Sequence, residues 1–220
     1  DWSSDVCSSD LVTTILVTGT ATEVGKTWFG SRVAAALRSG GRIVAARKPA
    51  QSFEPGTGPT DAEVLAAATG EPATTVCPAH RWYEVPMAPP MAASVLGRPE
   101  PTLAELVAEL APAPADAVLL VEGAGGPHSP IAADGDCVDL GRAIRADVVL
   151  LVADAGLGTI NAVRLCAGAL HGFPLVVALN RFDPADDLHR RNRDWLVGSG
   201  FRVVTDPEAA AVALAPAEGS

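Results

Sequence analysis

The sequence predicts an α/β fold: a single domain with a mostly parallel sheet and helices on both of its faces. Its apolar strands are continuous rather than alternating, helical segments separate them, and glycine and polar residues gather just after the strands. Strands that are buried on both faces have this continuous apolar pattern, and such sheets bind ligands beyond the carboxyl ends of their strands. A chain of 220 residues is long enough for one such domain.

The first half of the chain supplies strands, helices and one irregular region. We expect strands over 11–19 and 41–49, and helices over 25–39, 61–70 and 102–111. Thr102 and Glu105 have the spacing of a capping box at the start of the last of these helices. The proline-rich region 71–101 is expected to be irregular, with one helix near 91–97.

The second half of the chain repeats the alternation. Apolar runs within 116–126, 146–158, 174–181 and 201–207 predict strands, and helices are expected near 139–145, 159–170 and 187–198. Residues 1–10 are polar and rich in Ser and Asp, and fit neither a signal peptide nor the fold. We therefore predict a disordered, non-native leader at 1–10 and one domain over 11–220.

Charge and cysteine content exclude several classes of function. The net charge is −10 and the isoelectric point is about 4.8, which argues against a surface for nucleic acid or anionic membranes. No apolar run approaches the length of a membrane span. The cysteines (Cys7, Cys77, Cys137 and Cys166) lack metal-ligand spacing, which indicates free thiols in a reducing cytosol, so we expect a cytoplasmic protein.

A phosphate-binding loop follows the first strand. Gly19 is separated by five residues from Gly25-Lys26-Thr27, one more than in the usual pattern, and a helix is predicted directly after it. Such a loop binds phosphates with its backbone N–H groups and its lysine, which predicts a P-loop NTPase-like fold. The chain has only two lysines, Lys26 and Lys48, whereas it has fourteen arginines. The two lysines are expected where a compact charge is needed and a planar guanidinium will not serve.

Two carboxylates are candidates for a magnesium site together with Thr27. Mg²⁺ prefers oxygen ligands, and a charged residue such as Glu122 at the end of a buried strand is costly unless it serves a site. Asp61 opens a predicted helix after a loop rich in Gly and Pro, where it could equally be an N-cap.

The motifs "GTATEVGKT", "KPAQS", "TDA", "VEGAGG", "GTIN" and "LNR" occur in this order. Together they resemble the dethiobiotin synthase family over residues 12–207. The resemblance implies an ATP- and Mg²⁺-dependent cyclo-ligase of biotin biosynthesis that converts a diamine and CO₂ to a cyclic urea. It also implies a homodimer with the substrate near the subunit interface.

Site residues follow from the resemblance, each by its position in these motifs. Lys48 and Lys26 would be catalytic, Ser52 would bind substrate, and Thr27, Asp61 and Glu122 would bind Mg²⁺. The nucleotide would contact Glu23, Val24, Gly25, Lys26, Thr27, Trp28, Asp61, Glu122, Gly123, Ala124, Gly125, Asn180, Arg181 and Pro207, with Asn180 at the adenine. The substrate carboxylate would bind Gly158, Thr159, Ile160 and Asn161 of the partner subunit.

Two other ATP-dependent functions fit the loop less well. A ParA/MinD-type ATPase switch predicts a signature lysine early in the loop, where this chain has "TGTATE". A ligase domain like that of the cobyrinic acid amidases would be followed by a glutaminase domain. The loop also departs from the resemblance at Ala21, where the family commonly has Asp or Gly. Trp28 and Trp195 are expected to be packing residues.

Overall fold

The computed structural model describes residues 12–215, so the predicted leader at 1–10 lies outside the described part. Its centre is a six-stranded sheet in the order β10-β9-β8-β1-β5-β2, with every pair of neighbours parallel. This confirms the predicted α/β class. The strands are β1 (Thr13–Gly19), β2 (Val44–Arg47), β5 (Val118–Glu122), β8 (Val148–Asp154), β9 (Leu175–Asn180) and β10 (Arg202–Val204).

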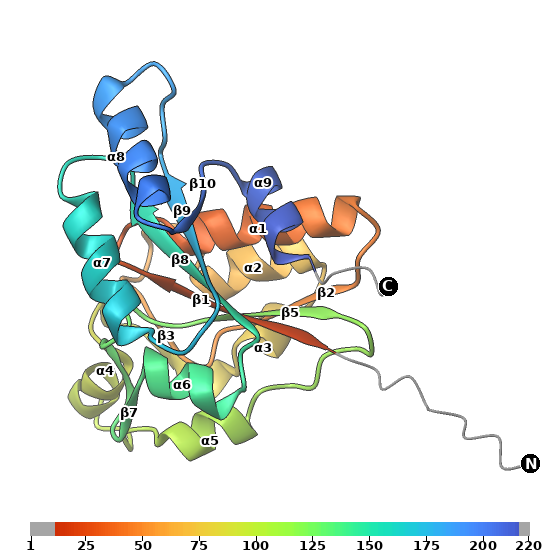
Figure 1. Cartoon of the computed structure of the whole chain (residues 1–220). Coiled ribbons are helices and arrows are strands. Elements are labelled where there is room, and N and C mark those ends of the chain that lie inside the picture. The colour runs from red at the N-terminus through yellow and green to blue at the C-terminus, as the bar shows by residue number, and fades with distance from the viewer. Residues whose placement is uncertain (1–11, 216–220) are drawn as a thin grey trace, which may run out of the picture.

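Helices cover both faces of this sheet (Figure 1). Alternate residues of β1 serve the two cores: Ile15 and Val17 pack under α1 and α9, while Leu16 faces the opposite core. The helices are α1 (Lys26–Ser39), α2 (Asp61–Thr69), α3 (Ala73–Val76), α4 (Pro89–Val95), α5 (Leu103–Ala108), α6 (Cys137–Ala143), α7 (Thr159–Ala169), α8 (Asp187–Gly198) and α9 (Pro207–Leu214). None of these helices is both long and apolar enough to cross a bilayer.

Short elements account for most differences from the sequence expectations. The strand expected over 41–49 is limited to Val44–Arg47, because β2 is the edge of the sheet and pairs with β5 alone. The region 71–101 is not purely irregular. It holds α3, a 3₁₀ turn (Ala79–Arg81) and α4, whose first position accepts proline because no intrahelical donor is needed there.

Two small pairings and the last helix were not predicted from the sequence. β3 (Gln51–Ser52) pairs with β4 (Trp82–Tyr83), and β6 (Pro130–Ala132) pairs with β7 (Gly135–Asp136). Strands of two or three residues are too short to show a periodic apolar pattern. Helix α9 is rich in alanine and so has no clear polar face.

The order of the strands defines a crevice beside β1. The chain passes from β1 through α1 to β2 at one edge, whereas the later strands β8, β9 and β10 extend the sheet in the other direction. In open parallel sheets, ligands bind at the carboxyl ends of the strands where this direction reverses. The loops that follow β1, β2 and β5 meet at this place, which positions the candidate site.

Candidate active site

The phosphate loop connects β1 to the first turn of α1. Glu23 and Gly25 both have left-handed backbone, with φ of 63° and 88°. A Cβ at Gly25 would lie 2.2 Å from Nδ2 of Asn180, so only glycine fits there. Lys26 Nζ donates to the carbonyl oxygen of Ala21 at 3.2 Å. Ala21, whose side chain departs from the resemblance, therefore contributes its backbone carbonyl oxygen as the acceptor for Lys26.

The glycine-rich loop after β5 is bonded to the phosphate loop. The N–H of Gly19 donates to the carbonyl oxygen of Gly125 at 3.2 Å, and Gly123 N–H donates to the carbonyl of Val17 at 3.0 Å. Gly125 has φ of 57°, and a Cβ there would lie 2.2 Å from Ser129 Oγ. The two backbone hydrogen bonds join the segments, so the two loops form one continuous wall.

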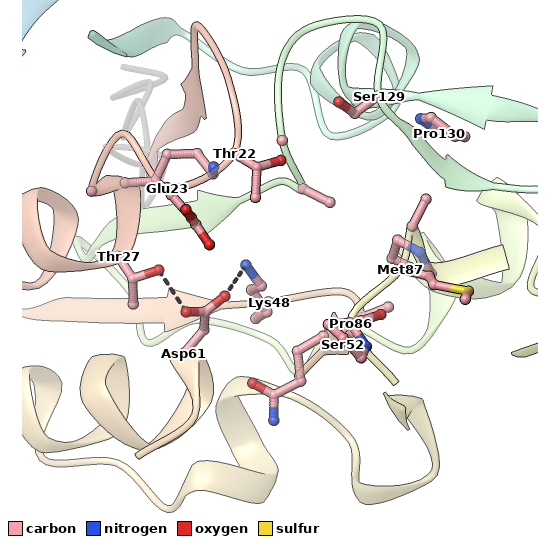
Figure 2. Close-up of a pocket in the computed structure, with 18 of the residues that line it drawn as sticks. Thr22, Glu23, Thr27, Lys48, Ser52, Asp61, Pro86, Met87, Ser129 and Pro130 are labelled. Carbon is pink, nitrogen blue, oxygen red and sulfur yellow. Dashed lines mark hydrogen bonds and ion pairs between the residues drawn. The ribbon is translucent and has the colours of Figure 1, made fainter. Parts of the chain in front are cut away.

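Lys48 lies directly beyond the end of β2 and makes three short contacts. Its Nζ is 2.7 Å from Asp61 Oδ2 and 2.6 Å from Glu122 Oε1, and donates to Gly123 O at 3.2 Å. Figure 2 shows Lys48 and Thr27 pointing toward Asp61 from opposite sides. All three ammonium protons thus have acceptors in one small volume, which fixes the lysine head in place.

Thr27 joins the same cluster from the start of α1. Its Oγ1 lies 2.8 Å from Asp61 Oδ1 and 2.8 Å from Glu122 Oε1, but a hydroxyl can donate its single proton to only one of them. Asp61 is not the N-cap of α2, because Thr60 accepts the bond from Glu63 N–H and completes a capping box. The alternative role of Asp61 is therefore filled by its neighbour, and its carboxylate is free to face the cluster.

Burial and mutual charge shift the pKa values of these groups. Burial lowers the pKa of Lys48, but Asp61 and Glu122 together outweigh it, so the net pKa is raised and the lysine stays charged. Burial raises the pKa of Glu122, which Lys48 only partly opposes. Burial and the positive charge of Lys48 lower the pKa of Lys26. The cluster therefore holds Lys48 as a fixed cation beside Glu122, a carboxylate whose ionised form is disfavoured by burial.

These residues border a cavity of about 520 Å³ at the carboxyl ends of the strands. Figure 2 shows Thr22 and Glu23 on one side of it and Met87 and Pro86 on the other. Of the residues expected at the site, those that line the cavity are Glu23, Gly25, Lys26, Thr27, Trp28, Lys48, Ser52, Asp61, Ala124 and Gly125. Residues from four separate chain segments thus meet in one volume.

Other expected residues lie beneath or outside this cavity. Glu122 and Gly123 support it through Lys48, and Val24 is buried with its carbonyl oxygen accepting from Asn180 Nδ2 at 2.9 Å. Arg181 donates to Glu23 O at 2.9 Å and pairs with Asp154 at 2.8 Å. Also outside its lining are Pro207, Gly158, Thr159, Ile160 and Asn161, at the starts of α9 and α7.

The sequence reasoning missed part of the cavity wall. Pro86 and Met87 come from the proline-rich region, and Ser129 from the segment after the double glycine. Gln51 lies between two expected site residues, and its Oε1 accepts from Ala62 N–H at 2.9 Å, directly after Asp61. The signal was the position of Gln51 within "KPAQS". No comparable signal marks Pro86 or Met87, because the fold brings that region to the site.

The two tryptophans differ from expectation. Trp28 is 49% exposed and lines the cavity, and Trp195 is 44% exposed on α8. Neither side chain is buried, and each ring lies near an arginine, Arg32 and Arg164 respectively.

Comparison with known proteins gives close relatives along most of the chain. The family model AAA_26, described as an AAA domain, matches residues 13–194. The chain is 42% identical over 179 residues to the ATP-dependent dethiobiotin synthetase BioD of Anaeromyxobacter dehalogenans (strain 2CP-C), covering 79% of this chain and 78% of the relative. It is 41% identical over 167 residues to the protein of that name from Rhodococcus jostii (strain RHA1), covering 74% and 70%.

Among solved structures, the signal recognition particle receptor FtsY from Elizabethkingia anophelis is similar in fold. The TM-score is 0.52 at 17% sequence identity, covering 88% of this chain and 57% of the receptor. At this identity the likeness extends to the P-loop α/β architecture alone.

Proposed function

The chain belongs to the ATP-dependent dethiobiotin synthetase family, and on that premise we propose that it carboxylates 7,8-diaminopelargonate with CO₂ and closes the ureido ring at the expense of ATP. The observation that carries this proposal is the position of Lys48. A buried ammonium, held by two carboxylates, faces a cavity that also borders the phosphate loop. A reaction that gathers negative charge between a carboxylated amine and a phosphate needs such a cation there.

Each chemical step makes a demand on the residues of the site. One amine of the substrate attacks CO₂ and loses a proton to give a carbamate. A carbamate oxygen then attacks the γ-phosphorus of ATP, releasing ADP and forming a carbamic-phosphoric anhydride. The second amine attacks the carbamoyl carbon, loses a proton and expels phosphate, which closes the ring. We propose that Lys26 and Lys48 stabilise the charge of the transferring phosphoryl group and of the carbamate.

We propose that Thr27, Asp61 and Glu122 hold Mg²⁺. Their oxygens converge, and Glu122 Oε2 is buried without a hydrogen-bond partner among residues 12–215. Hard oxygen donors of this kind fit Mg²⁺, which would neutralise phosphate charge when bound. The first turn of α1 would orient the phosphates, while Lys48 and Glu122 are buried beneath the cavity.

The substrate would lie between Ser52 and the wall formed by Pro86 and Met87. Ser52 Oγ is buried without a hydrogen-bond partner in the described part of the chain, so it can bond a polar substrate group. The wall is apolar, which suits a methylene chain. We propose that the substrate carboxylate binds the start of α7 in a partner subunit, where Gly158 precedes the helix and no side chain caps it.

Three further assignments concern the adenine base of ATP, the oligomeric state and the cellular location. We propose that adenine lies near Asn180, Arg181 and Pro207, at the end of β9 and the start of α9. A homodimer would cover the strongly exposed Leu157 next to Gly158. Cys77, Cys137 and Cys166 are free thiols, which supports a cytoplasmic location.

The function is tested by supplying diaminopelargonate, bicarbonate, Mg²⁺ and ATP to the purified protein. We expect ADP and a cyclic urea to form together, in amounts that depend on the diamine. If the rate of ATP hydrolysis does not depend on the diamine and no cyclic urea forms, the proposal is contradicted and an ATPase switch is favoured. Gel filtration or light scattering tests the dimer separately.

A further inference from the structure

The indole of Trp28 is an exposed aromatic surface at the edge of the active-site cavity. It follows Thr27 in the first turn of α1, lines the cavity, and is half exposed, while the next residue, Phe29, is buried. The guanidinium of Arg32, one turn later, lies 5.8 Å from the centre of the indole ring. Within residues 12–215, the guanidinium of Arg32 makes no ion pair or hydrogen bond, and the indole is the contact that the structure gives it.

The position of α1 determines what passes over this surface. Helix α1 packs against α2 on one side and α9 on the other. Asp61, at the phosphate end of the site, opens α2, and Pro207, at the proposed base end, opens α9. A nucleotide that reaches from the first place to the second must cross the first turn of α1. Backbone donors of that turn bind phosphates, and the nucleoside leaves the loop there.

We propose that Trp28 forms a nucleoside contact, in which the indole packs against the ribose and the guanidinium of Arg32 supports the ring. This inference rests on the proposed use of ATP at the site. Aromatic rings pack well against sugar and base surfaces, and a guanidinium held close to the ring strengthens the platform. Any residue at position 28 can supply the backbone N–H donor, so the contribution specific to Trp28 is the contact made by its indole side chain.

A second tryptophan of the same kind provides a control. Trp195 is exposed to a similar extent, and the guanidinium of Arg164 lies 5.6 Å from its ring centre. Trp195 does not line the cavity. An exposed Trp–Arg pair alone therefore indicates nothing about nucleotides, and the location of Trp28 is what distinguishes the two.

The experiment compares binding of ADP and of inorganic tripolyphosphate, which has phosphates but no nucleoside. Calorimetry is performed on the wild type and on Trp28→Ala, Trp28→Phe, Arg32→Ala and Trp195→Ala. For Trp28→Ala we expect ADP to bind about tenfold more weakly, with tripolyphosphate binding changed less than about twofold. Trp28→Phe should retain most of the affinity, Arg32→Ala should lose a few-fold for ADP, and Trp195→Ala should bind as the wild type does.

Intrinsic fluorescence gives an independent readout. Addition of ADP should change tryptophan emission in the wild type and in Trp195→Ala, but not in Trp28→Phe. Equal ADP affinity in Trp28→Ala and the wild type would overturn the inference, as would an equal loss for ADP and tripolyphosphate, which indicates a distorted loop. If the wild type binds neither ADP nor ATP, the proposed function fails along with it.

Discussion

Replacing Lys48 by methionine should destabilise the folded protein, because it leaves a buried carboxylate without its counter-ion. The ammonium is the closest cation to Glu122, at 2.6 Å, and the side chains of both residues are almost fully buried, at 4% and 2% exposure. Methionine has a similar length and shape but no charge. The change therefore removes the ion pair with little loss of packing.

The magnitude follows from the burial of each partner. Breaking a buried ion pair by removing one member costs about 3–5 kcal/mol, because the remaining charge stays desolvated. The side chain of Asp61 is 41% exposed, so water can solvate its carboxylate once Lys48 is removed. Loss of the Lys48–Asp61 ion pair therefore adds little to this cost. We therefore expect a loss of about 3–4 kcal/mol in the free energy of unfolding, which lowers Tm by about 10 °C in a domain of this size.

The pH dependence supplies the sharper check. A carboxyl whose pKa is raised on folding binds more protons in the folded state, so stability increases as the pH falls through the window between its unfolded and folded pKa values. The pKa of Glu122 is already raised by burial, and loss of the opposing lysine charge would raise it further. The stability deficit of Lys48→Met relative to the wild type should thus shrink as the pH is lowered.

Urea denaturation followed by circular dichroism measures both quantities. The reasoning is refuted if the unfolding free energies of Lys48→Met and the wild type agree within about 0.5 kcal/mol at pH 8, or if their difference is independent of pH. The double variant Lys48→Met/Glu122→Gln is the control. It removes both charges and should recover much of the lost stability.

Three further predictions concern activity and the loop. Lys48→Arg should lose about 100-fold or more in kcat for ring closure despite keeping its charge, because a planar fork cannot reproduce the compact three-way contact of the ammonium; wild-type-like kcat would contradict this. Glu122→Gln should raise the Mg²⁺ concentration needed for half-maximal activity by about tenfold, and an unchanged Mg²⁺ titration would remove this residue from the metal site. Gly25→Ala should abolish ADP binding because its Cβ would meet Asn180 at 2.2 Å, whereas Gly97→Ala, at a positive φ of 65° with open space around it, should bind ADP normally; equal binding by the two variants would show that the loop relaxes.

The sequence predicted the sheet and the phosphate loop because these depend on local patterns. Continuous apolar runs identify buried parallel strands wherever they occur, and the spacing of Gly25-Lys26-Thr27 after a strand identifies the loop. Elements of two to four residues, such as β3 and α3, were not predicted, since so few residues carry no period.

For the candidate site too, the sequence selected individual residues, whereas their contacts depend on the tertiary structure. Lysine scarcity and motif position were enough to select Lys48 and Glu122 from the sequence, before any contact between them was known. Their separation of 2.6 Å across 74 residues of chain follows from the pairing of β2 with β5, which places both strand ends at one edge. The sequence likewise left open whether Asp61 caps α2, and the backbone of α2 shows that Thr60 is the N-cap and that Asp61 faces the cluster.

The sequence by itself determined which residue types are present and in which order, and so the fold class and the phosphate loop. Only the tertiary structure decided that Pro86 and Met87 close the cavity and that Trp28 is exposed beside it. The physical reason is that exposure and contact between distant segments depend on how helices pack on the sheet. A local pattern records the propensity of a segment, whereas packing depends on what the rest of the chain places against it.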